Sequence, residues 1–383
     1  MKKILFVTSS LTVGGMERVL VDISNNLVKR GYDITIVTYE KSAEQNFIGE
    51  LDERIKFIYK KPREFKVRKK LPYIHRFYRP NKWETRTSSR ALYKYYVGTK
   101  TKYDVEIAFC RGPGVKIVSG STNRKSKKYT WVHNDYTLVN PKSIVKFFNS
   151  LDETKEAYKC FDKIVAVSNE AKKKFIEVIG YEEKLITIYN LLAIDKIIEK
   201  SKLDCPIKKK SFTIISVARL IPAKGYDMLL RIAKRLNDDG LDFDLWIVGT
   251  PYNDDYNKSL VKYIEDNNLT NAKLLGRQMN PYSFMSQADL YVCSSKVEGF
   301  SISVAEAITC GLPVITTKCT GPTEILGDGE YGIIVDFDEE QLYQALKNVI
   351  EHPETMKQFA DKAKDRSKAF SAENIIDQII ELF

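Results

Sequence analysis

The chain has 383 residues, too many for one hydrophobic core, and its 43% of hydrophobic residues are enough to fill two domains. No apolar run approaches the roughly 18 residues of a membrane-spanning helix, and six scattered cysteines without a CxxC pair exclude a disulfide scaffold. The net charge of +11 is a local feature, because residues 60–102 hold fifteen lysines and arginines against two acids.

The first half alternates strands with helices. The ILFV run at 4–7 is too short for the core of a signal peptide, so we expect a buried first strand and a cytoplasmic protein. A helix is predicted over 16–31, with Gly31 as its stop. The predicted strands are apolar throughout, which is typical of a parallel sheet covered on both faces. They span 2–10, 32–39, 103–110, 128–135 and 161–168.

The pattern breaks at 190–210, a lysine-rich stretch that we interpret as the linker between domains. A second strand–helix alternation follows, which indicates another doubly wound α/β unit. Its predicted strands are 212–218, 243–249, 272–276, 289–294, 312–317 and 331–336, and its predicted helices are 226–238, 254–267, 281–287 and 303–310. Residues 353–383 read as two more helices.

Ligands in such sheets bind beyond the carboxyl ends of the strands, so the loops there are the candidate sites. Gly14 and Gly15 precede the first helix, where backbone N–H groups are open to an anion, although a plain tight turn would use the same residues. Arg219 and Lys224 follow the first strand of the second half. Two cations in a strand-to-helix loop suit a diphosphate, although they are also ordinary surface charges.

The segment VEGFSISVAEA, residues 297–307, carries two carboxylates eight positions apart, Glu298 and Glu306. We expect a helix to begin near Ser301, with Ser301 as its cap, so that Glu298 precedes the helix and Glu306 lies in its early turns. The helix dipole alone would favour carboxylates there. The helix is otherwise apolar, however, and buried carboxylates need partners.

These residues resemble the donor-binding segment of retaining glycosyltransferases of the GT-B fold, family 4, whose E-x7-E motif Glu298 and Glu306 match. Other motifs of that family match in order across both halves. They are Gly14, Gly15, Glu17 and Arg18 in the first loop, Arg219 and Lys224, the strand-end Gly249, and Gly276 with Arg277. Departures are TPYNDD after 249 and Asn190-Leu191 where asparagine–proline is usual.

The resemblance implies an α/β fold of two Rossmann-like domains facing across a cleft. It implies an acceptor-side domain at 1–195, a nucleotide-sugar domain at 196–365, and a C-terminal helix, 366–383, that packs back on the first domain. It implies that Glu298 faces the donor sugar and Glu306 the ribose. His133 matches a histidine near the donor sugar, although a core histidine is the alternative. The implied catalytic set is Glu298, His133, Arg219 and Lys224, and the implied donor-binding set is Gly14, Gly15, Gly249, Arg277, Phe300, Ser301, Ile302 and Glu306.

No cofactor and no metal are expected, because Arg219 and Lys224 are placed to neutralise the leaving diphosphate. The alternative is a metal on one of two D-F-D strings, 242–244 and 336–338. We expect the first at the start of a strand, on the wrong side of the sheet, and the second in a surface turn.

The basic stretch, residues 60–102, interleaves cations with aromatic residues. It suits an anionic membrane that carries a polyprenyl-diphosphate-linked or glycan acceptor, a solvated surface over an ordinary core, or single-stranded nucleic acid. The sequence therefore predicts a metal-independent hexosyltransferase that uses a UDP-linked hexose or N-acetylhexosamine in surface polysaccharide or cell-wall glycan synthesis, peripheral on the inner membrane face. The alternatives are a basic nucleic-acid-binding protein and a non-catalytic nucleotide-sugar binder.

Overall fold

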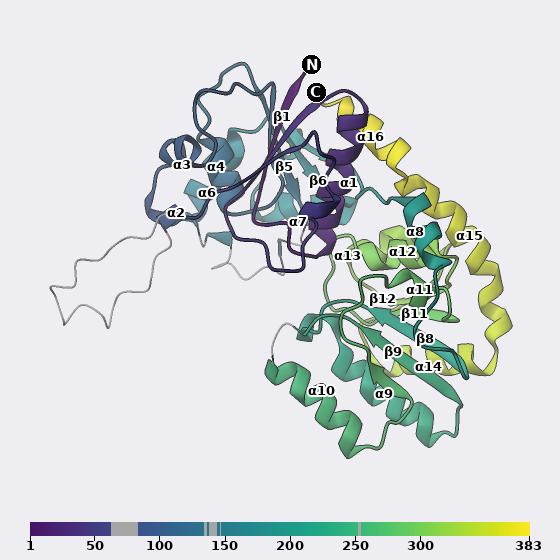
Figure 1. The fold of residues 1–383 in the computed structure, drawn as a ribbon. Helices are drawn as coiled ribbons and strands as arrows, with labels where there is room; N and C mark the ends of the chain where they lie inside the picture. Colours follow the sequence, from purple (N-terminus) through teal and green to yellow (C-terminus); the bar gives the residue numbers. More distant parts are fainter. Residues whose placement is uncertain (63–82, 134–135, 138–143, 146, 252–253) are drawn as a thin grey trace, which may run out of the picture. The chain divides into compact units, whose positions relative to one another are not determined.

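The computed structural model describes residues 1–62, 83–133, 136–137, 144–145, 147–251 and 254–383 (Figure 1). It divides into two compact units, Met1–Tyr189 with Ile376–Phe383, and Asn190–Ile375. The boundary between the units falls after Tyr189, whereas it was expected after residue 195. The chain returns to the first unit at Ile376, whereas residue 366 was expected.

The first unit is built on a seven-stranded sheet in the order β3-β2-β1-β4-β5-β6-β7, with every pair parallel. The strands are β1 (Lys3–Thr8), β2 (Asp33–Thr38), β3 (Lys56–Tyr59), β4 (Val105–Ala108), β5 (Lys127–Val132), β6 (Lys163–Ala166) and β7 (Leu185–Thr187). Leu5 lies opposite Thr35 on one side and Glu106 on the other, so the strand order reverses at β1. This reversal is the switch point at which open α/β sheets bind ligands.

Helices follow the strands of the first unit, and the first of them matches the helix predicted over 16–31. They are α1 (Gly15–Lys29), α2 (Trp83–Arg86), α3 (Ser89–Tyr96), α4 (Pro113–Ser119), α6 (Leu151–Lys159) and α7 (Asn169–Val178). Ser88, Ser150 and Ser168 cap α3, α6 and α7 through their side-chain oxygens, which satisfies one free backbone N–H in each first turn. One core cluster joins apolar side chains of the strands with those of α3, α4, α6 and α7.

The second unit repeats this plan with a six-stranded parallel sheet in the order β10-β9-β8-β11-β12-β13. The strands are β8 (Phe212–Val217), β9 (Phe243–Val248), β10 (Ala272–Leu274), β11 (Leu290–Cys293), β12 (Val314–Thr317) and β13 (Ile333–Val335). Here the order reverses at β8, so the switch point lies between the ends of β8 and β11.

Two groups of helices pack in the second unit (Figure 1). The first group is α9 (Tyr226–Asp238), α10 (Asp254–Asp266) and α14 (Glu339–Glu351). The second is α8 (Ile194–Ser201), α11 (Tyr282–Met285), α12 (Ile302–Thr309), α13 (Thr320–Ile325) and α15 (Lys357–Ser367). α12, which carries Glu306, contacts α8, α11, α13 and α15, and is buried along most of its length.

Two sequence predictions about the connecting segments need correction. The expected linker at 190–210 contains helix α8, which belongs to the second unit because Asn280 donates to the Lys200 carbonyl at 2.8 Å and Ser286 to the Ser201 carbonyl at 2.7 Å. The tail is divided as well. Arg366 donates to the carbonyls of Glu324 and Ile325 at 3.2 Å, which holds the end of α15 in the second unit.

The division passes through helix α16 (Ala372–Ile380), and residues 376–383 lie in the first unit. Asp377 pairs with Arg30 at 2.9 Å, and the Phe383 carbonyl accepts from Lys2 Nζ at 2.6 Å. The Phe383 ring lies edge-on to Tyr32. These contacts fix residues 376–383 against the β1–α1–β2 part of the unit.

Candidate functional site

Two loops meet at the switch point of the second unit, one after β8 and one after β11. Lys224 Nζ lies 2.5 Å from Glu298 Oε1, with only 14% and 11% of the two side chains exposed. Ser295 Oγ donates to the same carboxylate oxygen at 2.9 Å. Backbone contacts join the loops as well, because Ser294 Oγ donates to the Lys224 carbonyl at 2.8 Å and Lys296 N to the Ala223 carbonyl at 2.9 Å. A cation and a carboxylate predicted from distant parts of the sequence are thus in contact.

The start of α12 has a strained backbone. Ser301 has φ 65° and ψ 77°, a left-handed conformation that is uncommon outside glycine, and is 7% exposed. Its hydroxyl has no hydrogen-bond partner in the described structure and does not cap the helix, so the predicted capping role is wrong. Val304 N makes the first intrahelical bond, to the Ser301 carbonyl at 3.1 Å, so the amides of Ile302 and Ser303 precede the bonded helix. Strain of this kind is typical of ligand sites.

Glycines allow the close approaches around this site. A Cβ on Gly321 would lie 2.3 Å from backbone atoms of Phe300, so only glycine lets the start of α13 pack against the loop before α12. A Cβ on Gly249 would lie 1.7 Å from the Ala218 carbonyl oxygen, and Gly249 N donates to the Gly276 carbonyl at 2.9 Å. The predicted Gly249 therefore holds the loops after β8, β9 and β10 together.

The other predicted residues of the second unit differ in their surroundings. Glu306 lies in α12, 9% exposed, and accepts from Tyr282 OH at 2.7 Å. Arg277 is half-buried, and burial lowers the pKa of its guanidinium. Arg219 is exposed in the loop after β8. The structure therefore brings Lys224 and Glu298 into contact, whereas Glu306 lies within α12 and is bonded to Tyr282 instead.

A pair of buried thiols lies at the ends of β11 and β12, close to this carboxylate. A hydrogen bond from Cys319 lowers the pKa of Cys293 to about 7, and the same contact with burial raises the pKa of Cys319 well above its usual value. The charge of Glu298 raises the pKa of both thiols, and the charge of Lys224 lowers it. The thiols are thus part of the electrostatic surroundings of the ion pair.

The predicted residues of the first unit lie at the ends of its central strands. Gly14 precedes α1 in an extended conformation, and Gly15 is the first residue of the helix. Arg18 does not face a ligand loop, because Glu50 accepts from both of its terminal nitrogens, at 2.7 and 2.6 Å, and its guanidinium lies 3.8 Å from the Phe47 ring centre. Arg18 therefore holds α1 to the segment around Glu50.

His133 follows β5 and is half-buried. Its Nε2 lies 3.0 Å from the Phe109 carbonyl oxygen, and the two rings are 4.8 Å apart. Burial lowers the pKa of His133 to about 4, so the imidazole is neutral at pH 7. A neutral imidazole at a strand end is suited to hydrogen bonding with an uncharged group.

Sequence reasoning missed three residues that support the site, Tyr282, Ser295 and Gly321. Tyr282 and Ser295 hydrogen-bond the two glutamates, and Gly321 permits the packing of Phe300. The glycine in TGPTEI was a readable signal, since it stands at the start of a helix rather than at its end. Nothing in the sequence marks Tyr282 as the partner of a residue 24 positions away.

Both D-F-D strings serve the structure. Asp244, in β9, pairs with Lys273 at 3.1 Å, and Asp338 caps α14 by accepting from Gln341 N at 2.9 Å. Within the described ranges, no three His, Cys, Asp or Glu side chains are grouped as metal ligands would be. Independence from metal remains a prediction.

Comparison with known proteins identifies the family. Residues 13–196 match the model described as Glycosyltransferase Family 4, and residues 197–366 match the model described as Glycosyl transferases group 1. The chain belongs to these glycosyltransferases. Together the two matches cover residues 13–366, which include most of both units.

Relatives and solved structures extend this result. The glycosyltransferase is 34% identical over 190 residues, 49% of its length and 50% of the relative's, to an N-acetylgalactosamine-N,N'-diacetylbacillosaminyl-diphospho-undecaprenol 4-alpha-N-acetylgalactosaminyltransferase of Campylobacter jejuni. It therefore covers half of that enzyme. It is 27% identical to an uncharacterized glycosyltransferase of Haemophilus influenzae over 99% of both chains. The crystal structure of HepE from Anabaena with UDP and glucose superposes with a TM-score of 0.73, at 19% identity, over 100% and 99% of the two chains. The GT-B fold predicted from sequence is confirmed.

The basic stretch of this glycosyltransferase is described only in part, because residues 63–82 lie outside the described ranges. Of its aromatic residues, Tyr93 and Tyr96 are buried in the core, so they are not available to a membrane or to nucleic acid. Lys60 donates to the Tyr95 carbonyl at 2.7 Å. None of the helices in the described ranges is long and apolar enough to cross a membrane.

Proposed function

We propose that this protein is a retaining, metal-independent glycosyltransferase. It moves a hexose or N-acetylhexosamine from a UDP-linked donor to a glycan or lipid-linked acceptor in surface polysaccharide or cell-wall glycan synthesis. The observation that carries the proposal is the contact between Lys224 and Glu298 beside the strained, unpartnered Ser301 at the start of α12. Cations and open helix amides at one switch point suit a sugar diphosphate.

Each predicted residue has a task in this proposal. The amides of Ile302 and Ser303 and the Ser301 hydroxyl bind the diphosphate, and Lys224 moves from Glu298 to the phosphate oxygens when the donor arrives. Glu298, released from the lysine, accepts hydrogen bonds from the sugar hydroxyls. Arg219 adds a second cation. Stabilising the charge that develops on a leaving diphosphate is worth about 10²–10³ in rate for one well-placed donor.

The remaining residues position the donor and its sugar. Glu306, oriented by Tyr282, accepts from the ribose hydroxyls, and Arg277 lies on the base side. Gly14 and Gly15 leave the backbone before α1 open to the phosphate or sugar, and neutral His133 hydrogen-bonds the sugar. UDP as the nucleotide is supported by the HepE complex with UDP and glucose.

The acceptor assignment is supported by the Campylobacter relative, whose name gives a diphospho-undecaprenol acceptor. Such an acceptor places the enzyme on the inner face of the cell membrane, and the excess of cations in residues 60–102 suits an anionic surface. No observation on the described residues favours nucleic-acid binding, since Tyr93 and Tyr96 of the basic stretch are buried. A non-catalytic nucleotide-sugar binder would make the same donor contacts, so only an assay of sugar transfer distinguishes it from the enzyme.

Calorimetric titration with UDP-glucose, UDP-N-acetylglucosamine and UDP tests the donor site. We expect binding that Lys224→Met and Glu306→Gln each weaken by tenfold or more, since each removes a hydrogen bond to or from a charged group. Lys347→Met is the matched control, because Lys347 pairs with Asp239 at 2.6 Å on the surface of the same unit. Equal affinities for UDP in all three variants would remove the assignment.

Turnover is tested by NMR of the product's anomeric proton. A retaining transferase gives the α-linked product from an α-linked donor. Donor binding without transfer to any lipid-linked or glycan acceptor would favour the non-catalytic reading, and an inverted product would refute the retaining mechanism.

A further inference from the structure

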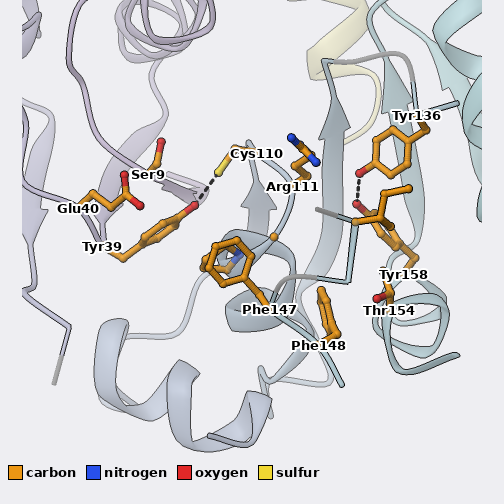
Figure 2. Close-up of a pocket in the computed structure, with 13 residues that line it drawn as sticks. Ser9, Tyr39, Glu40, Cys110, Arg111, Tyr136, Phe147, Phe148, Thr154 and Tyr158 are labelled. Carbon is orange, nitrogen blue, oxygen red and sulfur yellow. Dashed lines mark hydrogen bonds between the residues drawn. The ribbon is translucent and has the colours of Figure 1, made fainter. Parts of the chain in front are cut away.

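The first unit contains a pocket that the proposed donor contacts do not use (Figure 2). Its volume is about 230 Å³. It is formed by the segments after three neighbouring strands, with Ser9 after β1, Tyr39 after β2 and Arg111 after β4. Side chains of α6 and of Ile144, Phe147 and Phe148 close it. It lies at the switch point of the first sheet, where open α/β sheets bind ligands.

The walls of the pocket are aromatic, and their hydroxyl groups are paired with one another. Tyr39 OH lies 3.1 Å from Cys110 Sγ, and Tyr136 OH lies 2.6 Å from Tyr158 OH. All four side chains are buried, and burial raises the pKa of Tyr136 to about 12. Because these hydroxyl and thiol groups already hydrogen-bond one another, part of their polar capacity is used, and the ring faces and edges are the main surface that they offer a ligand.

Arg111 is the exception. Figure 2 draws its guanidinium between the Tyr39–Cys110 pair and the Tyr136–Tyr158 pair, with no dashed line reaching it. It is half-buried and makes no hydrogen bond or ion pair among the described residues. Glu40 is the only acidic side chain among the described residues that line the pocket; it is exposed and forms no ion pair with Arg111. A guanidinium in partly apolar surroundings without a carboxylate is a binding group for a planar or tetrahedral anion.

The wall opposite is fixed before any ligand arrives. Lys116, 2% exposed, donates to the Phe147 carbonyl at 3.0 Å and pairs with Glu153 at 3.2 Å. Gly112 has φ 80°, and a Cβ there would lie 2.8 Å from the Phe147 ring. The Lys116 charge is therefore neutralised within the protein, and among the described residues that line the pocket Arg111 is the cation that a ligand can reach.

The pocket is also next to a predicted catalytic residue. The Phe109 carbonyl contacts His133, and Cys110 and Arg111 follow Phe109 directly in the chain. A volume of about 230 Å³ is below the roughly 300–1,000 Å³ of sites for drug-sized ligands, so the pocket suits one sugar-sized group rather than a lipid chain.

We infer that this pocket binds an anionic sugar unit of the acceptor, with Arg111 as the fork for its phosphate or carboxylate and the aromatic rings against the apolar face of the sugar. The inference rests on the proposed function, because it makes the pocket the acceptor side of the same enzyme. It makes Arg111 a residue that determines specificity: neutral sugars fill the pocket but leave the guanidinium without an anion.

The test is calorimetry on the full chain with saturating UDP, which occupies the donor site, in about 0.15 M salt. The probes are α-glucose 1-phosphate, glucuronic acid and methyl α-glucoside. We expect at least one anionic probe to bind tenfold or more tightly than methyl α-glucoside, and Arg111→Gln to abolish that preference. The better of the two anions then identifies the source of the charge. Arg111→Lys should keep part of the preference, because it keeps the charge but loses the fork.

Arg124→Gln is the matched control, since Arg124 is an exposed arginine of the same unit outside the pocket. Equal binding of the neutral probe, or a preference that survives Arg111→Gln, would overturn the inference, and so would an equal loss in Arg124→Gln. The melting temperature of each variant shows whether it is folded. Failure of the proposed function has a different signature, namely no binding of UDP, whereas failure of the pocket inference leaves UDP binding intact.

Discussion

Replacing Lys224 by methionine tests whether the contact with Glu298 is a structural element as well as a ligand group. The substitution roughly keeps the length of the side chain but leaves the Glu298 carboxylate, 11% exposed, with Ser295 Oγ as its remaining hydrogen-bond donor among the described residues. Breaking a buried pair costs about 3–5 kcal/mol, and the remaining exposure reduces this to about 2–4 kcal/mol here. The surface pair of Lys347 and Asp239, with 31% of each side chain accessible, should contribute much less, because water screens its charges.

The assay is hydrogen-exchange mass spectrometry on peptides that span β8 and β11. It measures the local stability of the second unit alone, and this is needed because a chain of two units need not unfold in one step. We expect Lys224→Met to speed exchange there far more than Lys347→Met does. Adding Glu298→Gln to Lys224→Met should restore part of the protection, because the unpaired charge is then removed, with a coupling of about 1–3 kcal/mol. Unchanged protection in Lys224→Met, or a double variant less protected than the sum of the singles, would refute the reasoning.

Three further predictions concern separate features. Glu106 is fully buried in β4, and burial raises its pKa. The wild type should therefore lose stability relative to Glu106→Gln as the pH rises from about 4.5, as measured by urea unfolding at pH 4.5 and 7.5. Parallel pH profiles of the two proteins would contradict this. Gly321→Ala should weaken UDP binding by tenfold or more, because its methyl group displaces the backbone at Phe300 next to Ser301, while Gly240→Ala at an exposed helix end should leave UDP affinity unchanged. Transfer should be equal with and without EDTA, and a rate restored only by added magnesium or manganese would refute independence from metal.

Much of the fold was predictable from the sequence because both sheets are parallel and buried. The continuous apolar runs predicted β1, β2, β4, β5 and β6 and all six strands of the second sheet, but not β3, β7 or the strand order. Gly31, predicted as the stop of the first helix, does adopt φ 86° at the end of α1. Helix α8 was missed because it is eight residues long and lies among lysines and a Cys–Pro pair. Its helical state depends on contacts with α11 and α12, which are tertiary and have no local signal.

The candidate site was predictable in its residues but not in its geometry. The resemblance supplied Lys224 and Glu298, whereas their contact follows from the neighbouring positions of β8 and β11 in the sheet. The left-handed backbone at Ser301 could not be predicted, since serine ordinarily avoids that conformation. The pocket around Arg111 was missed because its lining comes from loops that are distant in sequence.

The return of residues 376–383 to the first unit has a consequence for synthesis on the ribosome. The second unit is one continuous segment, 190–375, and can complete its sheet as soon as it has emerged. The first unit, although translated earlier, lacks the contacts of Asp377 and Phe383 until the last of these residues has left the exit tunnel. The first unit is therefore completed after the second, although it is translated first. Until then Tyr32 and Tyr129 lack their ring contacts with Phe383.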